Sequence, residues 1–412
     1  MKDMSLPSVD YDVLIVGGGM VGATLACALG NTNLKVGVVE AYTFGANNQP
    51  SYDDRSIALA YGSRRIIEGM GLWSALKSQV TPINKIHISD RGHFGFTRLD
   101  AVDYGVGALG YVVELRVMGA VLADALSQLS NVDLISPAKV VGLTQSSTHM
   151  DVSIERDGAE QSLSTRLVVG ADGDKSFVRQ LLNIPTDRDE YDQAAVIANV
   201  TPSKSHDGVA YERFTETGPL ALLPLSNNRC SLVWTVKADQ TEEILNLSDD
   251  AFLERLQSRF GFRLGQFEHV GRRQAYPLAL VRAQEHVVER VALIGNAAHT
   301  LHPVAGQGFN LGIRDVAALA QVIVDAERIG EDLGKKKVLN DYLEWRIKDH
   351  QQVITFTDTL ARLFANNSPP LALVRNCCLV ALDLMPIVKG KLAQKTMGLA
   401  GKQPRLTRQL SL

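Results

Sequence analysis

The segment from Tyr11 to Leu29 constrains the fold of this chain more strongly than any other. An apolar run leads directly into Gly17-Gly18-Gly19-Met20-Val21-Gly22, and a second apolar run follows. The first run is typical of a strand buried on both faces, and the second of a packed helix. Gly17 permits a tight turn, Gly19 lets a pyrophosphate approach the helix N-terminus, and Gly22 permits close helix–strand packing. The segment therefore predicts a dinucleotide-binding unit.

Two further observations bear on this prediction. A strand-like run, Lys35 to Val39, ends in Glu40, where a carboxylate can accept hydrogen bonds from a ribose. The run Gly105 to Gly110 also matches G-x-G-x-x-G. We reject this second match because a polar stretch precedes it and an extended stretch follows, whereas phosphate binding requires a strand before the glycines and a helix after them.

A loop of small residues, Gly295 to Asn310, joins a strand-like run to a helix-like run that extends to Val324. Gly306 and Gly308 leave backbone N–H groups accessible, so an electron-rich ring or an anion can approach closely. Taken alone, the loop is also compatible with an ordinary connection between a strand and a helix.

Three charged residues are weaker candidates. Arg55 is compatible with a phosphate or ring contact, or with a solvated surface charge, and Arg116 opens a predicted helix where an anion can bind. Asp172 follows the strand-like Leu167 to Gly170, and its carboxylate suits either a ligand hydroxyl or a helix cap.

Composition excludes several classes of protein. The 412 residues carry a formal charge of -3, without a basic run, which excludes nucleic acid as a partner. Four cysteines with no metal-ligand spacing predict neither a metal site nor a disulfide framework. No signal-peptide order and no uncharged run long enough to span a membrane is visible, so we expect a cytoplasmic protein.

The texture of the chain predicts its domain organisation. Parallel α/β patterns at both ends flank alternating strand-like segments from about Ala194 to Tyr276, which indicate an inserted antiparallel sheet. We also expect exposed β structure from Ile83 to Phe96. The predicted fold class is α/β, with a Rossmann-like domain formed by residues 8–80, 103–185 and 277–350, a mainly antiparallel substrate domain formed by residues 81–102 and 186–276, and a C-terminal helical region, residues 351–412.

Three motifs together resemble a known family. Gly17 to Gly22 with Glu40, the Asp172-Gly173 turn, and Gly295 to Asn310 with Asp315 are similar in order and spacing to the FAD-dependent aromatic hydroxylases of the p-hydroxybenzoate hydroxylase type. Shorter stretches, such as His87 to His93 and Gly218 to Pro224, resemble the subgroup that hydroxylates 2-polyprenyl-6-methoxyphenol in ubiquinone biosynthesis.

The resemblance implies roles for individual residues. FAD would be bound by Gly17, Gly19, Met20, Val21, Gly22 and Glu40 at its ADP half, by Arg55 and Arg116 near the flavin, by Asp172 in a motif shared with NAD(P)H binding, and by Asn296, Pro303, Gly306, Gly308 and Asn310 around the isoalloxazine. The wider family has Gly-Asp where this chain has Gly295-Asn296. A ribityl contact usually made by a carboxylate would then be made by an amide.

The resemblance also implies the reaction. NAD(P)H would reduce FAD, the reduced flavin would capture O2 as a C4a-hydroperoxide, and an oxygen atom would pass to the ring of a polyprenyl phenol. His299 and His302 lie in the loop from Gly295 to Asn310, called the flavin loop below. A structural role for each is favoured over proton transfer, so no general base is assigned. The alternatives are hydroxylation of another ubiquinone precursor or another phenol, a flavin reductase or halogenase, and a non-catalytic FAD-binding subunit of a membrane-associated assembly.

The C-terminal region leaves its partner open. The stretch from Leu371 to Val388, followed by Lys389 and Lys391, is apolar for a surface segment. Packing on the protein's own core is one explanation. Peripheral contact with the inner membrane, with other ubiquinone-biosynthesis proteins or with a second copy of the chain is the other.

Overall fold

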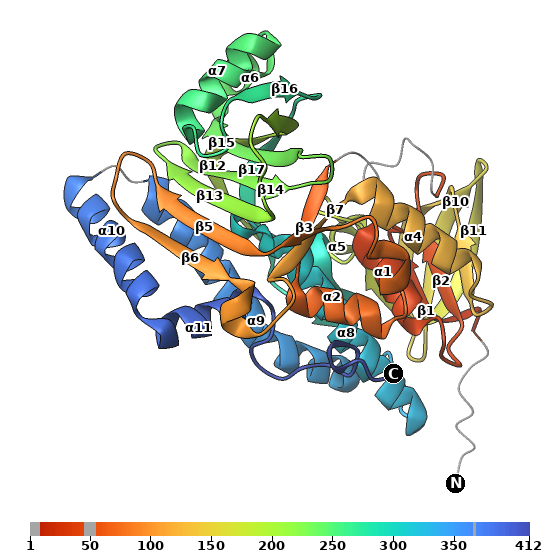
Figure 1. The fold of residues 1–412 in the computed structure, drawn as a ribbon. Coiled ribbons are helices and arrows are strands. Elements are labelled where there is room, and N and C mark those ends of the chain that lie inside the picture. Colours follow the sequence, from red (N-terminus) through yellow and green to blue (C-terminus); the bar gives the residue numbers. More distant parts are fainter. Residues whose placement is uncertain (1–8, 45–54, 366–367) are drawn as a thin grey trace.

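The computed structural model describes residues 9–44, 55–365 and 368–412. The predicted domain boundary at residue 8 lies outside these ranges. Within them the chain forms three β-sheets and a set of helices that ends in a C-terminal group (Figure 1). The predicted α/β fold class is confirmed.

An eight-stranded sheet contains the predicted dinucleotide-binding unit. Five of its strands are parallel, in the order β19-β11-β1-β2-β8; β10 pairs antiparallel with β11, and β9 pairs antiparallel with β10. The strands are β1 (Tyr11–Val16), β2 (Val36–Val39), β8 (Val132–Ile135), β9 (Lys139–Gln145), β10 (Met150–Arg156), β11 (Ala159–Gly170), β18 (Val287–Val288) and β19 (Val291–Leu293).

Both faces of the parallel strands are buried, which explains their continuous hydrophobicity. Val13 and Ile15 of β1 pack toward α1 (Met20–Leu29), α4 (Leu115–Ser127) and α8 (Gln307–Arg328). Leu14 and Val16 pack on the opposite face, with residues from β9, β10 and α5 (Phe177–Leu181). Alternate side chains of β1 therefore belong to two separate hydrophobic cores, one on each face of the sheet.

A nine-stranded sheet forms the second layer. Its order is β20-β17-β12-β15-β14-β13-β5-β6, with β16 paired to β12, and β13 and β5 are its one parallel pair. The strands are β5 (Lys85–Asp90), β6 (Phe96–Asp100), β12 (Thr186–Pro202), β13 (Val209–Thr215), β14 (Gly218–Pro224), β15 (Cys230–Lys237), β16 (Phe267–Val270), β17 (Gln274–Ala283) and β20 (His299–Thr300). One face packs against α7 (Asp249–Phe260) and α6 (Thr241–Leu245).

The expectation of exposed β structure from Ile83 to Phe96 is wrong for β5. His87 and Asp90 are buried, because β5 pairs with both β6 and β13 and because α10 (Pro369–Leu384) covers this end of the sheet. These neighbours are distant in sequence, so the local pattern carried no sign of them.

A small antiparallel sheet joins the two larger layers. It consists of β3 (Ser56–Ala60), β7 (Gly110–Glu114) and β4 (Thr81–Ile83), in the order β3-β7-β4. The rejected match from Gly105 to Gly110 runs into β7 rather than into a helix, which supports its rejection.

Helices complete the fold. The remaining ones are α2 (Tyr61–Gly69), α3 (Trp73–Leu76), α9 (Lys336–Ala365), α11 (Pro386–Thr396) and the short 3-10 turns η1 (Ala101–Tyr104), η2 (Ala238–Gln240), η3 (Gly295–Ala297), η4 (Val304–Gly306) and η5 (Leu406–Arg408). The 30-residue α9 runs across the predicted boundary between residues 350 and 351, and the domain division itself stays a prediction. In Figure 1, α10 and α11 lie beside β5 and β6.

Candidate active site

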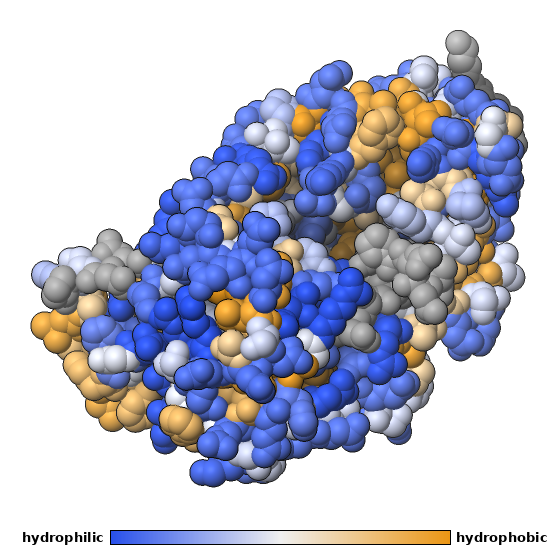
Figure 2. All heavy atoms as spheres, turned by 90° about the horizontal axis from the view of Figure 1, so that it is seen from above, coloured by the Kyte–Doolittle hydropathy of each residue, from blue (hydrophilic) through white to orange (hydrophobic). Residues whose placement is uncertain are grey.

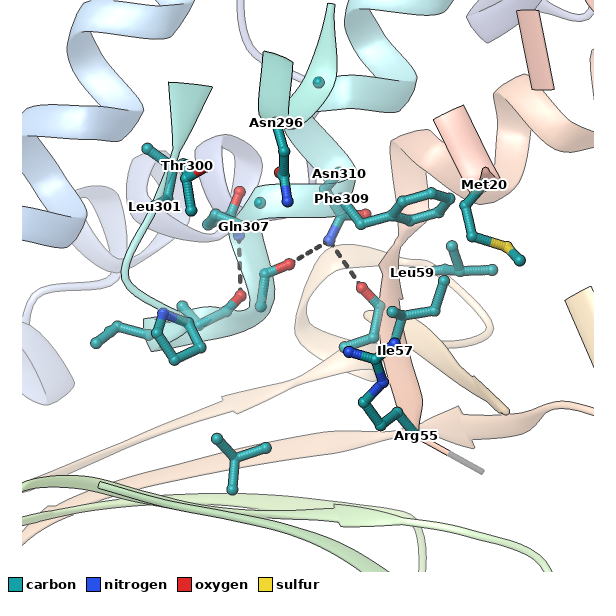
Figure 3. Close-up of a pocket in the computed structure, with 18 of the residues that line it drawn as sticks. Met20, Arg55, Ile57, Leu59, Asn296, Thr300, Leu301, Gln307, Phe309 and Asn310 are labelled. Atoms are coloured by element: carbon teal, nitrogen blue, oxygen red, sulfur yellow. Dashed lines mark hydrogen bonds between the residues drawn. The ribbon is translucent and has the colours of Figure 1, made fainter. Parts of the chain in front are cut away.

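A cavity of about 1310 Å³ lies where the sheets and the C-terminal helices meet. Its walls come from the glycine turn after β1, from β3, from the loop before α8, from one face of the nine-stranded sheet and from α9, α10 and α11. Figure 3 shows the end where Asn296, Thr300 and Gln307 of the loop lie across from Arg55 and Ile57.

The glycine turn has the geometry that phosphate binding needs. Gly17 has φ +103°, and a Cβ on Gly17 would lie 2.5 Å from the carbonyl oxygen of Ala171. A Cβ on Gly22 would lie 1.9 Å from the carbonyl oxygen of Gly17, so only glycine allows α1 to approach β1 this closely. Gly17, Gly19, Met20 and Val21 line the cavity, and Gly22 supports them from behind.

Glu40 lines the cavity next to this turn, and its side chain is held in place from two sides. One carboxylate oxygen accepts a hydrogen bond from Gly18 N at 2.7 Å, and the other accepts one from Tyr42 N at 2.9 Å. Each oxygen keeps a further lone pair, so the carboxylate can also accept hydrogen bonds from ribose hydroxyls.

The two arginines predicted near the flavin are placed differently. Arg55 lines the cavity, with its guanidinium carbon 5.0 Å from the ring centroid of Tyr276. The side chain of Arg116 is 58% exposed and lies outside the cavity lining, with Nη2 2.5 Å from Oε2 of Glu114. The structure therefore brings Arg55, but not Arg116, to the other candidates.

Asp172 fills one of its two predicted roles, the helix cap. Its Oδ2 accepts hydrogen bonds from Phe177 N at 2.7 Å and Val178 N at 3.0 Å, which caps α5. Its Oδ1 is buried and has no hydrogen-bond partner among the residues that the structure describes. Asp172 lines the cavity, and a contact from this oxygen to a ligand hydroxyl stays a prediction.

The loop before α8 adopts backbone conformations that most residues avoid. Gly295 and Gly306 both have φ +59°, and Ala305 has φ +56°, which is unusual for a residue with a Cβ. A Cβ on Gly308 would meet open space. Asn296, Pro303, Gly306 and Gly308 all line the cavity, and the Asn296 side chain is exposed to it.

Asn310 ties this loop to the small sheet. Its Nδ2 donates to Ala58 O and to Gly306 O, each at 2.7 Å, and its Oδ1 accepts from Ala60 N at 2.8 Å (Figure 3). Asn310 lines the cavity as predicted, but its amide also fixes the loop against β3.

A buried charge cluster behind the loop was not predicted. Asp315 of α8 accepts hydrogen bonds from Arg346 Nε at 2.7 Å, from His350 Nε2 at 2.6 Å and from His299 Nε2 at 3.2 Å. Burial alone would raise the pKa of Asp315, but the charges and hydrogen bonds of these partners hold that pKa well below its usual value. The sequence showed Asp315 only as part of the family motif, since its partners come from other elements.

This cluster has the residue types of a metal site. His299, Asp315 and His350 bring their ligand atoms within 4.8 Å of one another. The Arg346 guanidinium already neutralises the carboxylate, however, and a second cation beside it would be repelled. The arrangement is better explained as a structural ion-pair network.

The two loop histidines do not line the cavity. Burial lowers the pKa of His302 to about 4, and its Nδ1 accepts a hydrogen bond from Val304 N at 3.3 Å. His299 is held by Asp315. These contacts agree with the structural role that the sequence favoured for both histidines.

Comparison with known proteins identifies the family. A family model described as "FAD binding domain" matches residues 10–357. The chain belongs to this family. It is an FAD-dependent aromatic hydroxylase, a monooxygenase for which NAD(P)H is the typical electron donor.

Relatives and solved structures agree with this assignment. Ubiquinone hydroxylase UbiL of Rhodospirillum rubrum is 39% identical, covering 97% of this chain and 93% of the relative. The 3-demethoxyubiquinol 3-hydroxylase of Escherichia coli is 33% identical, covering 94% and 98%. The crystal structure of p-nitrophenol 4-monooxygenase PnpA from Pseudomonas putida superposes with a TM-score of 0.79 at 20% identity, covering 95% and 98%, which shows a shared fold.

The residues present fit FAD. Any Cβ would fill the contact between Gly17 and Gly22, the lining residue Asp172 has an unpartnered Oδ1 among the described residues, and two backbone N–H groups hold the Glu40 carboxylate beside the glycine turn. Twelve of the fourteen predicted residues line one cavity, and Gly22 and Arg116 do not. The individual contacts to FAD remain predictions.

Proposed function

We propose that this enzyme hydroxylates the aromatic ring of a polyprenyl phenol, 2-polyprenyl-6-methoxyphenol or a neighbouring precursor, in ubiquinone biosynthesis. The observation that carries the proposal is the shape of the cavity, which continues from the flavin loop along the nine-stranded sheet to the C-terminal helices. Apolar side chains line this far end: Phe356, Leu360, Phe364, Leu379, Leu382 and Leu392. Such a lining suits an isoprenoid chain and not a small polar phenol.

The chemistry is divided between cofactor and protein. When bound, FAD supplies the redox chemistry that activates O2. The chain itself provides an apolar cavity that excludes water and a rigid loop that fixes one end of the cavity, where Asn310 holds Gly306 against Ala58. We assign the nine-stranded sheet as the platform for the substrate.

The names of the relatives leave the ring position open. They support the ubiquinone pathway, but one of them is named for 3-demethoxyubiquinol, so hydroxylation of another precursor is the second candidate. The experiment is to incubate FAD-loaded protein with NADH or NADPH, ¹⁸O2 and each prenylated phenol. One labelled oxygen in the product, at a defined ring carbon, is expected. Oxidation of NAD(P)H without oxygenation of any of these phenols, together with normal quinone levels in a deletion strain, would refute the proposal and favour a non-catalytic subunit.

We also propose that the enzyme binds peripherally to a membrane through α10 and α11. Among the described residues no single helix is long and apolar enough to cross a membrane. Taken together, α10 and α11 have the length and apolar composition of a membrane span, but they are bent by 96° at their junction. The outer face of α10 and its junction with α11 carry exposed apolar residues, among them Leu373, Val374, Leu384, Met385, Ile387 and Val388. The apolar colour gathers at the left edge of Figure 2, the side where α10 lies in Figure 1.

Two features support a lipid surface as the partner. Lys391 is exposed on α11 next to the apolar junction, which suits anionic headgroups. Leu379 and Leu382, on the inner side of α10, line the cavity. A membrane that holds the substrate would therefore lie one helix away from the cavity.

A further inference from the structure

The face of the nine-stranded sheet that lines the cavity is mainly apolar, with a few threonines and tyrosines and one charged residue. On β13, Ala210, Glu212 and Phe214 alternate with residues of the opposite face, and all three line the cavity. Among the described residues of this sheet that line the cavity, Glu212 is the one that carries a charged side chain. Its apolar neighbours there include Ile86, Ile88, Leu99, Ala221, Leu223 and Val233.

The carboxyl of Glu212 lacks partners of the kind that hold Glu40 and Asp172. No hydrogen bond or ion pair connects it to any other residue in the described ranges, and its register partners are Ile88 on β5 and Ala221 on β14. Burial raises the pKa of Glu212 to about 7. An acidic group in such surroundings destabilises the apolar face, so a role in substrate chemistry explains its presence better than packing does.

Several other polar groups around the cavity have structural roles. Glu40 is held by two backbone N–H groups, and Asp172 caps α5. The hydroxyl of Tyr276 donates to Gln274 Oε1 at 2.7 Å. His299 and His302 lie outside the lining.

We propose that Glu212 is the general base for the hydroxylation, accepting the proton of the substrate's phenolic hydroxyl. This inference rests on the proposed function. The phenol O–H bond breaks, the proton passes to a carboxylate oxygen of Glu212, and the electron pair remains on the phenolate oxygen. The electron-rich ring is then a stronger nucleophile toward the activated oxygen that FAD, NAD(P)H and O2 supply. When the hydroxylated ring regains aromaticity, its ring proton passes to the second oxygen atom of O2, which leaves as water, and Glu212 returns its own proton to the phenolate.

The placement suits this role. In Figure 3 the flavin loop lies above the strands of the sheet, so a ring held between them has the loop on one side and the sheet face on the other. A base with a pKa near 7 is largely deprotonated at slightly alkaline pH and can accept a proton in the transition state.

The test compares Glu212→Gln and Glu212→Asp with the wild type and with Glu268→Gln, a control that removes an exposed carboxylate from β16 of the same sheet. The readouts are FAD content, NAD(P)H oxidation, hydroxylated product and released peroxide, with a short-chain prenylated methoxyphenol as the probe. We expect Glu212→Gln to bind FAD and oxidise NAD(P)H normally, to lose ring hydroxylation by about 100-fold, and to release peroxide instead. Glu268→Gln should behave as wild type.

The pH profile separates a base from a packing role. The wild-type kcat/KM for hydroxylation should fall at acid pH with an apparent pKa near 7. In Glu212→Gln this limb should disappear, and the residual rate should rise toward the pKa of the free phenol, about 10. Glu212→Asp should recover part of the hydroxylation rate and keep the fall of kcat/KM at acid pH. If Glu212→Gln does not fold, Glu212→Asp alone tests the assignment.

The outcomes are distinguishable from failure of the proposed function. A wild-type enzyme that oxygenates no phenol refutes the function itself. Two results with an active wild-type enzyme overturn only the assignment of Glu212. In the first, Glu212→Gln hydroxylates the phenol as fast as the wild type and releases no extra peroxide. In the second, kcat/KM of Glu212→Asp does not fall at acid pH.

Discussion

Asp90 of β5 and Arg375 of α10 form a buried ion pair, with Arg375 Nε 2.8 Å from Asp90 Oδ2 and both side chains only 3–4% exposed. Asn376 reinforces the pair, since its Nδ2 donates to the same oxygen at 2.7 Å. These contacts fasten α10 to the sheet.

Removing one partner of this pair should release α10. Asp90→Ala leaves the Arg375 guanidinium buried beside an apolar side chain, which costs about 3–5 kcal/mol. We expect the free energy of unfolding to drop by that amount and proteolysis to begin near α10. Replacing both residues by apolar ones, Asp90→Ala with Arg375→Met, should cost less than Asp90→Ala alone. An equal or larger loss in the double variant would mean that the pair itself is strongly stabilising.

Asn296→Asp should retain or tighten FAD binding. Asn296 lines the cavity, and the family resemblance implies a ribityl contact at this position, so we expect aspartate to accept that hydrogen bond more strongly. Flavin fluorescence titration of the two proteins gives the two values of Kd. A clear loss of flavin would show that Asn296 does not occupy the ribityl position.

Asp172→Ala should have two separable effects. Loss of the α5 cap should lower the stability of the FAD-free protein by about 1 kcal/mol. Loss of the orphaned Oδ1 should additionally weaken FAD binding. Ser176→Ala is the matched control, because Ser176 Oγ caps the same helix by accepting from Arg179 N at 3.1 Å but does not line the cavity. Equal FAD affinity in both variants would leave Asp172 as a cap alone.

Stability should fall as the pH decreases below about 6.5. Burial lowers the pKa of His302 to about 4 and that of His286 to about 3, against an ordinary value of 6.5. Between these values the unfolded chain binds protons that the native protein does not, so stability is fully present above pH 6.5 and is lost as the pH falls. Each histidine contributes up to about 1.4 kcal/mol per pH unit. Urea unfolding from pH 7.5 to 5 measures the slope, and His302→Gln should reduce it by one proton. An unchanged slope would mean that His302 titrates alike in both states.

Ile387→Glu should weaken binding to lipid vesicles. The Ile387 side chain is 79% exposed next to Leu384, so a carboxylate there disturbs no packing but opposes insertion into a bilayer. Flotation with vesicles containing anionic lipid should recover the wild-type protein and far less of the variant. Ile329→Glu, which replaces an apolar residue that is 72% exposed after α8, is the control. Equal loss in both variants would indicate a general effect of charge.

The parts of the site that depend on local chemistry could be predicted from the sequence. Gly17 and Gly22 predict the turn after β1, because no other residue fits the close contact between α1 and β1. Gly306 predicts the left-handed backbone before α8. The role of Glu212 could not be predicted in this way. It depends on the parallel pairing of β13 with β5, more than one hundred residues apart, which turns its side chain into the cavity. The network around Asp315 likewise needs α8, α9 and β20 to meet.

The amide of Asn310 has a mechanical consequence. Two of its hydrogen bonds, with Ala58 O and Ala60 N, join the flavin loop to β3, and the third ties Asn310 to Gly306 within the loop, so the loop can shift away from the small sheet only if the first two break. A wall clamped in this way has no hinge of its own. At the opposite end of the cavity, α10 is fastened by side-chain contacts to Asp90 rather than by a continuous sheet, so we expect an opening that admits a bulky substrate to occur there.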